Sequence, residues 1–466
     1  MQMMKPWMKA GAGLGLLTLH PTQSVEAKKI QQEVSPNIVF ILADDMGYGD
    51  LGCYGNQVIQ TPVIDGLAEE GLRFTQFYAG ASVSSPSRAC LMTGLHTGHA
   101  RIRGNMCRAG GIEGTREGMV GTVRRTSLQP EDVTIAAALK EKDYYSCLVN
   151  KWHLDGFDTT AGPLDRGFDE FYGWTIHEPR SHNFYPDVRW RNRERYEIPL
   201  NQDGSRADHN TDRSTAEALD FLRRAAQKEQ PFYLYLAYNA PHVPLDAKET
   251  HLYDDSGLPD TDRRYAALIS HMDACIGQVL STLDSLGLTQ ETIVVFASDN
   301  GGAKAAAVEQ LDLNGGLRGW KGELYEGGIR VPVIVRWPGF VEAGTTSHVP
   351  AYFPDFFNTF LDVADLEHAY TEDGVSLLPV LLKGKKSLGN RFLYWEQFPR
   401  TGISQAVRYG KWKAIRMQRD QDWVLYDLES DPTELHNVAE KHPRILKRIE
   451  RFIASNRTES ENWPIE

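Results

Sequence analysis

Asn37-Ile38-Val39-Phe40-Ile41-Leu42-Ala43, followed by Asp44 and Asp45, is the stretch that decides the fold class of this chain. The run is apolar at every position after Asn37 and rich in branched residues, which is typical of a parallel strand buried on both faces. Ligand sites in open α/β sheets collect at the carboxyl ends of such strands. The two carboxylates therefore mark one edge of the predicted sheet as a candidate functional site.

The segments that follow alternate between strand and helix patterns. Residues 262–286 carry their apolar side chains on one stripe, which predicts an amphipathic helix that covers a sheet. Thr61-Pro62 begins another helix, which ends near Gly71, because proline suits a first helical turn. This alternation predicts an α/β sandwich with a large, mostly parallel central sheet flanked by helices. The other expected elements are a helix at 134–142 and strands at 144–149, 231–238, 292–297 and 331–335.

The pattern changes at about Leu388. Short strand candidates succeed one another without helices between them, and a final helix is expected at 444–453. We therefore predict a large N-terminal α/β domain over residues 35–387 and a small C-terminal α+β subdomain over 388–466, with an antiparallel sheet and one helix. The strand candidates of the small subdomain are 392–394, 404–407, 412–415 and 423–426.

Composition and charge limit the classes of function. The chain has 466 residues, of which 41% are hydrophobic and 24% charged, as in globular proteins. Its net charge of −12 argues against nucleic-acid binding, since the neutralisation of phosphates needs a basic surface. Six arginines nevertheless lie between Arg101 and Arg125, against Glu113 and Glu117. This run is either a solvated loop or a surface that receives an anionic substrate.

Residues 1–27 are typical of an export signal. Lys5 and Lys9 precede the small, apolar run 10–19, and residues 25–27 resemble a cleavage site. We expect a periplasmic or secreted protein. No later segment has the roughly 20 apolar residues of a membrane span. The five cysteines form no Cys-x-x-Cys pair, which argues against zinc, and their odd number leaves at least one thiol free.

The string Ser84-Ser85-Pro86-Ser87-Arg88-Ala89-Cys90-Leu91-Met92-Thr93-Gly94 carries the most specific pattern. Ser84 is suited to cap a helix whose first turn holds Pro86. Arg88 lies four residues on and therefore shares a helix face with Ser84. A negatively charged group at position 84 would meet both a helix N-terminus and a guanidinium group. The alternative is an ordinary capped helix.

Further polar residues follow the predicted strands. Asp299-Asn300-Gly301-Gly302 ends a strand in the way that Asp44 and Asp45 do. Carboxylate and amide oxygens are hard ligands and suit Ca²⁺ or Mg²⁺ rather than zinc. The alternative is that both strings only make turns. Lys151 and His153 follow one strand, His242 follows another, and Lys321 lies in Arg318-Gly319-Trp320-Lys321-Gly322. Alone, Lys151 with His153 is more often a surface pair, and His242 a satisfied loop histidine, than a site, whereas the Lys321 string is more specific.

From about Asn37 to the C-terminus these strings, in consistent order, resemble the formylglycine-dependent sulfatase family, in its Ser-type bacterial branch of arylsulfatases and N-acetylgalactosamine-sulfatases. The Ser84 string is similar to the signature whose first residue is oxidised to formylglycine (3-oxoalanine). The strings 425–428 and 431–434 resemble the C-terminal subdomain of that family. Asn150 and Asp155 depart from the family's Gly-Lys-Trp-His-Leu-Gly, which puts the local geometry of that loop in doubt.

The resemblance implies a fold, a cofactor and a site. The fold is the alkaline-phosphatase-like sandwich. The oxidation of Ser84 would need an anaerobic sulfatase-maturing enzyme as a partner. The implied metal is Ca²⁺ ahead of Mg²⁺, held by Asp44, Asp45, Ser84, Asp299 and Asn300. The implied catalytic residues are Ser84, Arg88, Lys151, His153, His242 and Lys321.

The chemistry of sulfate esters assigns roles to these residues. Cations must neutralise the ester oxygens before a nucleophile can approach, and the metal, Lys151 and Lys321 are expected to do so. One hydroxyl of the hydrated aldehyde attacks sulfur, and His242 protonates the leaving alcohol. The second hydroxyl loses its proton to His153, and the covalent sulfo-enzyme intermediate breaks down. An unmodified serine lacks that second hydroxyl.

The expected substrate is a sulfate monoester of a galactose or N-acetylgalactosamine unit in a carbohydrate. Two loops are candidates for sugar contacts, the segment 96–105 after the Ser84 helix and the segment 174–190, where a tryptophan would stack on the sugar. Both are otherwise surface scaffolding. The candidate substrate-binding residues are Arg101, Arg103, Asn105 and His177.

Two other functions remain open from the sequence. One is a phosphomonoesterase or phosphodiesterase of the same superfamily, although such enzymes usually hold two zinc ions with several histidines. The other is a non-catalytic protein that binds sulfated glycans through an unmodified Ser84. The set of Lys151, His153, His242 and Lys321 weighs against a pure binder, which needs no acid for a leaving group.

Overall fold

The apolar run around Phe40 forms β1 (Asn37–Asp44), and all eight of its residues are buried in the computed structural model. The structure describes residues 35–115, 121–175, 182–366, 373–399 and 402–465, and Ser35–Glu466 make up one unit. The predicted export signal, residues 1–27, lies outside the described residues.

Within the described residues, ten strands form one large sheet in the order β13-β2-β12-β11-β1-β10-β6-β7-β8-β9. The five neighbours β11, β1, β10, β6 and β7 run parallel, which confirms the mostly parallel centre. The strand predicted at 331–335 joins β11 in the antiparallel direction. The strands are β2 (Leu72–Phe74), β6 (Tyr145–Lys151), β7 (Glu170–Trp174), β8 (Val188–Arg191), β9 (Glu194–Glu197), β10 (Phe232–Pro241), β11 (Thr292–Ser298), β12 (Val333–Arg336) and β13 (Thr345–Ser347).

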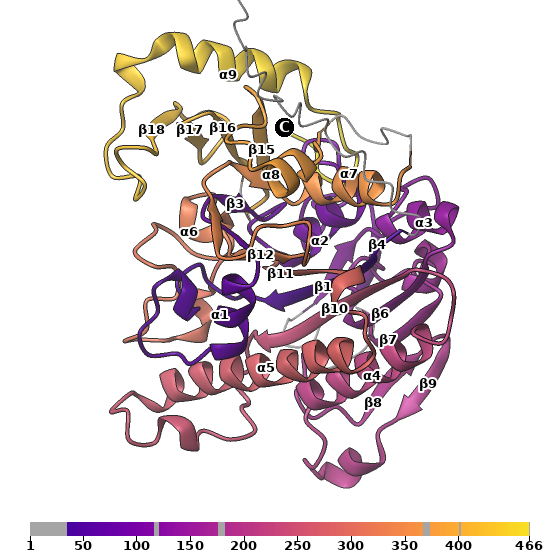
Figure 1. Cartoon of the computed structure of the whole chain (residues 1–466). Coiled ribbons are helices and arrows are strands. Elements are labelled where there is room, and N and C mark those ends of the chain that lie inside the picture. The colour runs from indigo at the N-terminus through magenta and orange to yellow at the C-terminus, as the bar shows by residue number, and fades with distance from the viewer. Residues whose placement is uncertain (1–34, 116–120, 176–181, 367–372, 400–401, 466) are drawn as a thin grey trace, which may run out of the picture. The chain divides into compact units, whose positions relative to one another are not determined.

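Helices cover both faces of this sheet, because alternate residues of a strand point to opposite sides. Phe40 and Leu42 belong to a core formed with α2, α3 and α7, whereas Val39 and Ile41 belong to a core formed with α1, α4 and α5. Figure 1 shows the two helical layers above and below the sheet, as the sandwich prediction requires. The helices are α1 (Pro62–Glu69), α2 (Ser84–Thr93), α3 (Ile135–Leu139), α4 (Asn210–Ala225), α5 (Asp260–Ser285), α6 (Glu326–Ile329), α7 (Pro354–Val363) and α8 (Leu378–Lys383).

The C-terminal part forms a second, antiparallel sheet with one helix, as predicted. Its strands run in the order β15-β16-β17-β18, and α9 (Pro443–Ser455) packs on one face through Ile449. The other face packs through Trp395 against Tyr78 and Tyr352, which come earlier in the sequence. Lys413 is fully buried and bridges Glu326 of α6, at 2.8 Å, and Glu434, at 2.9 Å. The strands are β15 (Phe392–Gln397), β16 (Ser404–Tyr409), β17 (Trp412–Arg416) and β18 (Val424–Asp427).

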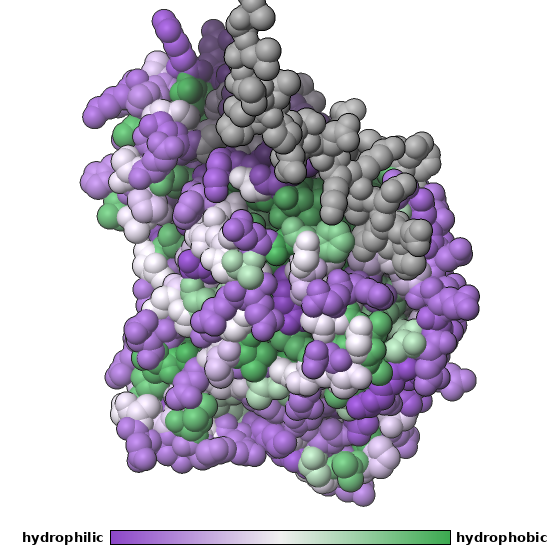
Figure 2. Space-filling model, viewed as in Figure 1, coloured by the Kyte–Doolittle hydropathy of each residue, from purple (hydrophilic) through white to green (hydrophobic). Residues whose placement is uncertain are grey.

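Two smaller pairings complete the described strands: β3 (Phe77–Tyr78) with β14 (Ala351–Tyr352), and β4 (Ile112–Thr115) with β5 (Thr122–Arg125). All five cysteines lie in described residues and none forms a disulfide. Among the described helices, none is long and apolar enough to cross a membrane. The face in Figure 2 is mainly hydrophilic, with hydrophobic residues in small separate groups.

Candidate active site

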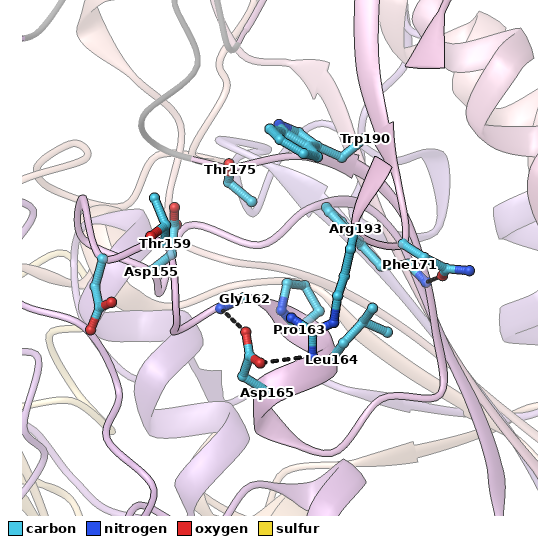
Figure 3. Close-up of a pocket in the computed structure, with 12 residues that line it drawn as sticks. Asp155, Thr159, Gly162, Pro163, Leu164, Asp165, Phe171, Thr175, Trp190 and Arg193 are labelled. Carbon is cyan, nitrogen blue, oxygen red and sulfur yellow. Dashed lines mark hydrogen bonds and ion pairs between the residues drawn. The ribbon is translucent and has the colours of Figure 1, made fainter. Parts of the chain in front are cut away.

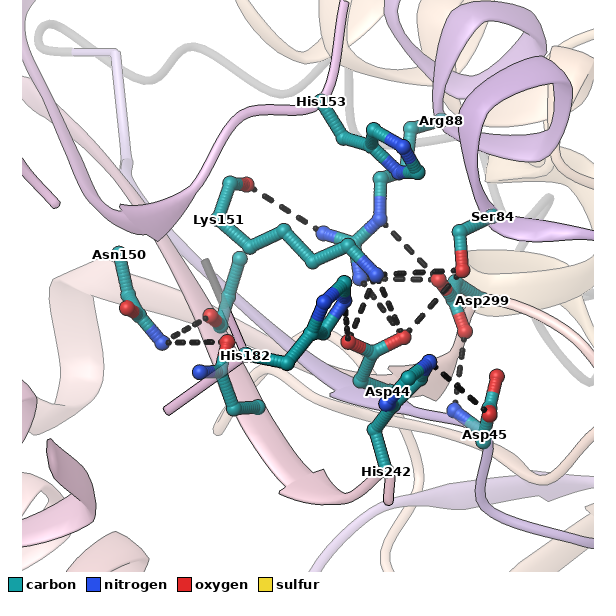
Figure 4. Close-up of polar contacts among 12 residues, drawn as sticks. Asp44, Asp45, Ser84, Arg88, Asn150, Lys151, His153, His182, His242 and Asp299 are labelled. Carbon is teal, nitrogen blue, oxygen red and sulfur yellow. Dashed lines mark hydrogen bonds and ion pairs between the residues drawn. The ribbon is translucent and has the colours of Figure 1, made fainter. Parts of the chain in front are cut away.

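Four adjacent parallel strands bring most of the predicted site residues to one edge of the sheet. β1 ends in Asp44, β6 ends in Lys151, β10 leads into His242, and β11 leads into Asp299. Figure 4 shows these side chains pointing toward one another, with Ser84 and Arg88 reaching in from α2. The prediction that the strand ends converge is therefore confirmed by the fold.

Ser84 is the first residue of α2 and is not its cap. Val83 occupies the N-cap position, and its carbonyl accepts the N–H of Ser87 at 3.2 Å. The predicted helix cap at Ser84 is wrong by one residue, and the reason matters for function. Its hydroxyl turns away from the helix amides and lies 3.3 Å from Asp44 Oδ1 and 3.2 Å from Lys151 Nζ. Only 1% of Ser84 is exposed.

Arg88 lies one turn further along α2 and is fully buried. Its Nε and Nη2 donate to the same oxygen of Asp299, at 3.1 and 2.9 Å, and Nη2 lies 3.6 Å from Asp44. Burial opposes a charge on this side chain, but Asp299 and other anionic neighbours outweigh that effect and raise the pKa of Arg88 above its usual range. Arg88 is thus a permanent cation beneath residue 84.

The carboxylates of Asp44, Asp45 and Asp299 lie within 4.8 Å of one another, all in the interior. Asn300 donates from Nδ2 to Asp45 Oδ1 at 2.9 Å, which leaves its Oδ1 3.4 Å from the Ser84 hydroxyl. Asp45 itself has a φ of 68°, a left-handed conformation that turns it back toward its neighbours. Four hard oxygen donors therefore meet at one point, which fits Ca²⁺ or Mg²⁺.

Charge in the site is balanced by cations. Lys151 Nζ lies 2.6 Å from Asp44, and Lys321 Nζ lies 2.6 Å from Asp45. Burial would raise the pKa of Asp44, but Lys151 and the other cations hold it well below its usual range. Burial lowers the pKa of Lys151 to about 8. The charges of the three carboxylates are cancelled by those of Arg88, Lys151 and Lys321. A divalent cation would add two positive charges, which would balance a singly charged sulfate ester and one anionic oxygen on residue 84.

The loop after β6 explains the departure at Asn150. Asn150 has a φ of 81°, a left-handed conformation that glycine adopts freely and that asparagine tolerates better than most residues. Its side chain donates to the carbonyl of Ala237 at 3.0 Å and to Asn239 at 3.2 Å, both on β10. The asparagine therefore ties the loop to the neighbouring strand and keeps Lys151 in place.

His153 is held by an arginine that the sequence reasoning did not assign to the site. Arg125 Nη1 lies 3.1 Å from His153 Nε2. A guanidinium only donates, so Nε2 accepts and the hydrogen of the neutral ring lies on Nδ1. Burial, together with Lys151 and Arg125, lowers the pKa of His153 well below its usual value. In this state the neutral ring of His153 has an N–H to donate at Nδ1. The proton-accepting role expected for His153 stays a prediction.

His242 and His182 form the accessible side of the site. Their rings stack at 4.0 Å, and His242 Nε2 lies 3.5 Å from Asp45. The His242 Nδ1 lies 2.5 Å from the carbonyl of Val243, so Nδ1 carries a hydrogen and Nε2 is the nitrogen that gains or loses one. The exposed fractions of His242, Lys321 and His182 are 14%, 19% and 19%, against 0% for Arg88 and Lys151. These three side chains mark the entrance.

The candidate sugar-binding residues differ in how close they lie to the site. Asn105 accepts the backbone N–H of Ser85 at 2.9 Å and so lies beside the site. Arg103 is 2% exposed and donates to Ala100 and Thr458, so its prediction as a sugar ligand is wrong: the side chain is committed to the interior. Arg101 pairs with Asp132 and Glu131. His177 lies outside the described residues. His182, from the same loop, is the histidine that the structure brings in.

Two segments that carry site residues also line a cavity of about 160 Å³ (Figure 3). Asp155 comes two residues after His153, and Thr175 follows Trp174, whose ring packs against His153 and His182. Trp190 and Phe171 supply aromatic walls. The cavity thus combines aromatic and polar side chains. The tryptophan contact with sugar expected from the 174–190 segment stays a prediction.

Comparison with known proteins gives matches along most of the chain. The sulfatase family matches residues 36–366, and the C-terminal family of N-sulphoglucosamine sulphohydrolase matches 317–458. N-acetylgalactosamine-6-sulfatase from Mus musculus is 34% identical over 87% of this chain and 76% of its own length. N-acetylgalactosamine-6-O-sulfatase from Bacteroides thetaiotaomicron is 30% identical over 96% and 98%. The crystal structure of Ps i-CgsB in complex with k-i-k-neocarrahexaose superposes with a TM-score of 0.79 at 28% identity, covering 93% of this chain and 95% of that one.

Proposed function

Because the chain belongs to the sulfatase family and is a sulfuric ester hydrolase, we propose that it removes an O-sulfate from a galactose or N-acetylgalactosamine type carbohydrate. The observation that carries the proposal is the position of Ser84. Its buried side chain lies between the carboxylate of Asp44, the amide oxygen of Asn300 and the ammonium group of Lys151. A nucleophile at this point meets both a metal-binding set and cations for sulfate oxygens.

Residue 84 is proposed to act as formylglycine, which supplies two hydroxyls on one carbon when hydrated, one to attack sulfur and one to let the sulfate leave. The surroundings of Ser84 suit such a group. Lys151 Nζ, 3.2 Å from the Ser84 oxygen, is positioned to stabilise an anionic oxygen there. Arg88 lies behind it with its charge fixed by Asp299. Oxidation of Ser84 would be carried out by an anaerobic sulfatase-maturing enzyme.

Asp44, Asp45, Asp299 and Asn300 are proposed to hold a divalent cation, Ca²⁺ ahead of Mg²⁺, together with the group on residue 84. The donor set supports this assignment, because three buried carboxylates and an amide oxygen are hard ligands. When bound, the cation would supply two positive charges next to the ester oxygens. Lys151 and Lys321, now paired with Asp44 and Asp45, would then be available to bind the sulfate group.

His242 is proposed to protonate the leaving sugar hydroxyl. Its Nδ1 donates to the carbonyl of Val243, so Nε2 is the ring nitrogen left to hold the transferable proton. Asp45, 3.5 Å away, stabilises the protonated ring against the effect of burial, which lowers its pKa. His153 is proposed to take the proton of the second hydroxyl of the hydrated residue 84, and Arg125 holds its ring through Nε2.

Two kinds of evidence support the proposed sugar: the names of similar proteins, and the side chains that surround the site. Two relatives over most of its length are named as N-acetylgalactosamine-6-sulfatases, and a structural neighbour was crystallised in complex with k-i-k-neocarrahexaose. Asn105 and His182 are the described side chains from the two predicted loops that lie beside the reacting group. We further propose export to the periplasm or beyond, on the basis of the signal-like residues 1–27.

The test is a desulfation assay with natively matured protein. The panel comprises 6-sulfated and 4-sulfated N-acetylgalactosamine, 6-sulfated galactose, 6-sulfated N-acetylglucosamine, an aryl sulfate and the matching aryl phosphate. We expect sulfate release from a galactose or N-acetylgalactosamine ester at a kcat/KM well above that for the glucosamine ester. Equal or faster hydrolysis of the phosphate would contradict the proposal and favour the phosphatase alternative. Binding of the sugars without any turnover would favour the glycan-binding alternative.

A further inference from the structure

A cleft rich in cations lies between the small antiparallel sheet and the segment that follows β13. Its walls come from residues 386–391 before β15, from the end of β16 and the turn after it, and from residues 348–350. Its described lining includes none of the catalytic or metal-binding residues proposed above. The cleft has a volume of about 550 Å³, which is within the range of ligand sites.

The lining of this cleft is positively charged, although the whole chain has a net charge of −12. Its described residues include four cations and a single carboxylate: Lys386, Arg391, Arg408 and Lys411 against Glu429. Charges of one sign gathered in a concave surface raise the local concentration of ligands of the opposite sign. The cleft therefore favours an anionic ligand.

Internal ion pairs explain two of the four cations. Arg391 donates to both oxygens of Asp355, each at 2.5 Å. Lys411 Nζ lies 2.6 Å from Asp427. These pairs hold both side chains in place, and neither cation needs a ligand.

Arg408 differs, because it is buried and its hydrogen-bond partners are neutral. Only 4% of the residue is exposed. Its guanidinium group donates to the carbonyl of Gly410 at 3.0 Å, to the hydroxyl of Tyr78 and to the side-chain oxygen of Gln76. Among the described residues, no carboxylate pairs with it directly. A buried charge without a counter-ion is costly, so this guanidinium group is prepared for an anion in the cleft.

Tyr78 connects Arg408 to one carboxylate, but the charge of that carboxylate is already shared. The hydroxyl of Tyr78 donates to Glu326 at 2.7 Å. Glu326 also pairs with Lys413 at 2.8 Å and with Arg330 at 3.3 Å. Lys413 in turn pairs with a second carboxylate. This network holds three cations and two carboxylates, which are Arg330, Arg408 and Lys413 with Glu326 and Glu434. One positive charge is therefore in excess beside the cleft.

We propose that the cleft binds a sulfated sugar unit of a polysaccharide, apart from the unit that is desulfated. The planar fork of Arg408 suits two oxygens of one sulfate group, and Lys386 adds a second cation. The cleft is larger than a sulfate group needs. Asn390 and Ser387 offer hydrogen bonds to sugar hydroxyls, and Leu388 offers apolar surface to the ring. Binding there would hold the protein on the polysaccharide.

The choice of a sulfated sugar rests on the proposed function, so the experiment measures binding without turnover. Calorimetry uses the full-length Ser84→Ala protein with chondroitin 6-sulfate tetrasaccharide, unsulfated chondroitin tetrasaccharide and inorganic sulfate. We expect the sulfated tetrasaccharide to bind the cleft and to slow hydrogen exchange in residues 386–393 and 405–411. Protein that binds in this way but releases no sulfate from any ester would refute the proposed function and leave this inference standing.

Two substitutions test the cations that lack a counter-ion. Lys386→Glu should remove the slowed exchange and weaken binding at the cleft by about tenfold or more, because hydrogen bonds between charged partners are the strong ones. Arg408→Lys keeps the buried charge but loses the planar fork, so it should weaken binding to a similar extent. The matched control is Lys385→Glu, which makes the same change of charge at the preceding residue, outside the described lining. It should bind as the parent does.

Three results would overturn the proposal. One is slowed exchange confined to the segments of the active site. Another is equally tight binding of the unsulfated tetrasaccharide or of inorganic sulfate, which would mean that the cleft does not recognise a sugar-borne sulfate group. The third is folded Lys386→Glu protein that binds the sulfated tetrasaccharide as tightly as Lys385→Glu does.

Discussion

Replacement of His242 by alanine should separate the chemistry of the leaving group from the binding of sulfate. The structure leaves one nitrogen of His242, Nε2, to hold the transferable proton, because Nδ1 is bound to the Val243 carbonyl at 2.5 Å. A sugar alkoxide is a poor leaving group and needs that proton in the transition state, whereas an aryl oxide hardly does. General acids contribute about 10²–10⁴-fold, and the fixed ring orientation favours a value near the middle, about 10³-fold, or roughly 4 kcal/mol.

The assay compares kcat/KM for a sulfated N-acetylgalactosamine and for a nitrophenyl sulfate. His242→Ala should lose about 10³-fold on the sugar and less than about tenfold on the aryl ester. His251→Ala is the control, because this histidine is 74% exposed and pairs only with Glu249 among the described residues. Equal losses on both substrates would refute the reasoning, since they would mean that His242 supports the metal or the nucleophile instead of the leaving oxygen.

Three further outcomes follow from the same contacts. Asp45→Asn should weaken Ca²⁺ binding by calorimetry and abolish turnover, because one of three converging carboxylates is lost, whereas the exposed Asp420→Asn should change neither; unaltered Ca²⁺ affinity would remove Asp45 from the metal set. Lys413→Met should lower the free energy of unfolding by about 3–5 kcal/mol in urea titrations, because it leaves Glu326 and Glu434 without their shared buried cation; a loss below 1 kcal/mol would contradict that account. Burial raises the pKa of Asp50 to about 8 from 3.8, so the folded state holds a proton that the unfolded state releases. The free energy of unfolding should therefore fall as pH rises from about 4 to 8, by at most about 4 kcal/mol at pH 7. Asp50→Asn should flatten that slope; an unchanged slope in urea midpoints between pH 5 and 8 would show that Asp50 is not its source.

Much of the fold was accessible from the sequence because its strands are apolar on both faces. β1 and β10 lie in the middle of the sheet with helices on either side, so a continuous apolar run is the physical requirement for them. The short edge strands β8 and β9 were not predicted. They are polar and half-exposed, and their pattern resembles a loop.

The site was predictable where the residues follow the ends of parallel strands, as Asp44, Lys151 and Asp299 do. It was not predictable where contact depends on a side chain's direction. Arg125 and Arg103 belong to the same arginine run, yet one binds His153 and the other is taken up by Thr458 and Ala100. His182 was visible only as one of several polar residues in a loop. Its stacking on His242 depends on how β7 and β10 lie on either side of β6 in the sheet.

The central claim is that Ser84 becomes the catalytic aldehyde of a sulfatase, and its most direct test is the mass of the tryptic peptide 74–88 from active protein. The peptide should be lighter than its sequence by two hydrogens, with fragment ions that assign the change to residue 84 rather than to Ser82, Ser85 or Ser87. Across preparations, the specific activity should rise in proportion to the oxidised fraction, and Ser84→Ala should be inactive. Fully active protein that carries an intact serine at position 84 would contradict the account.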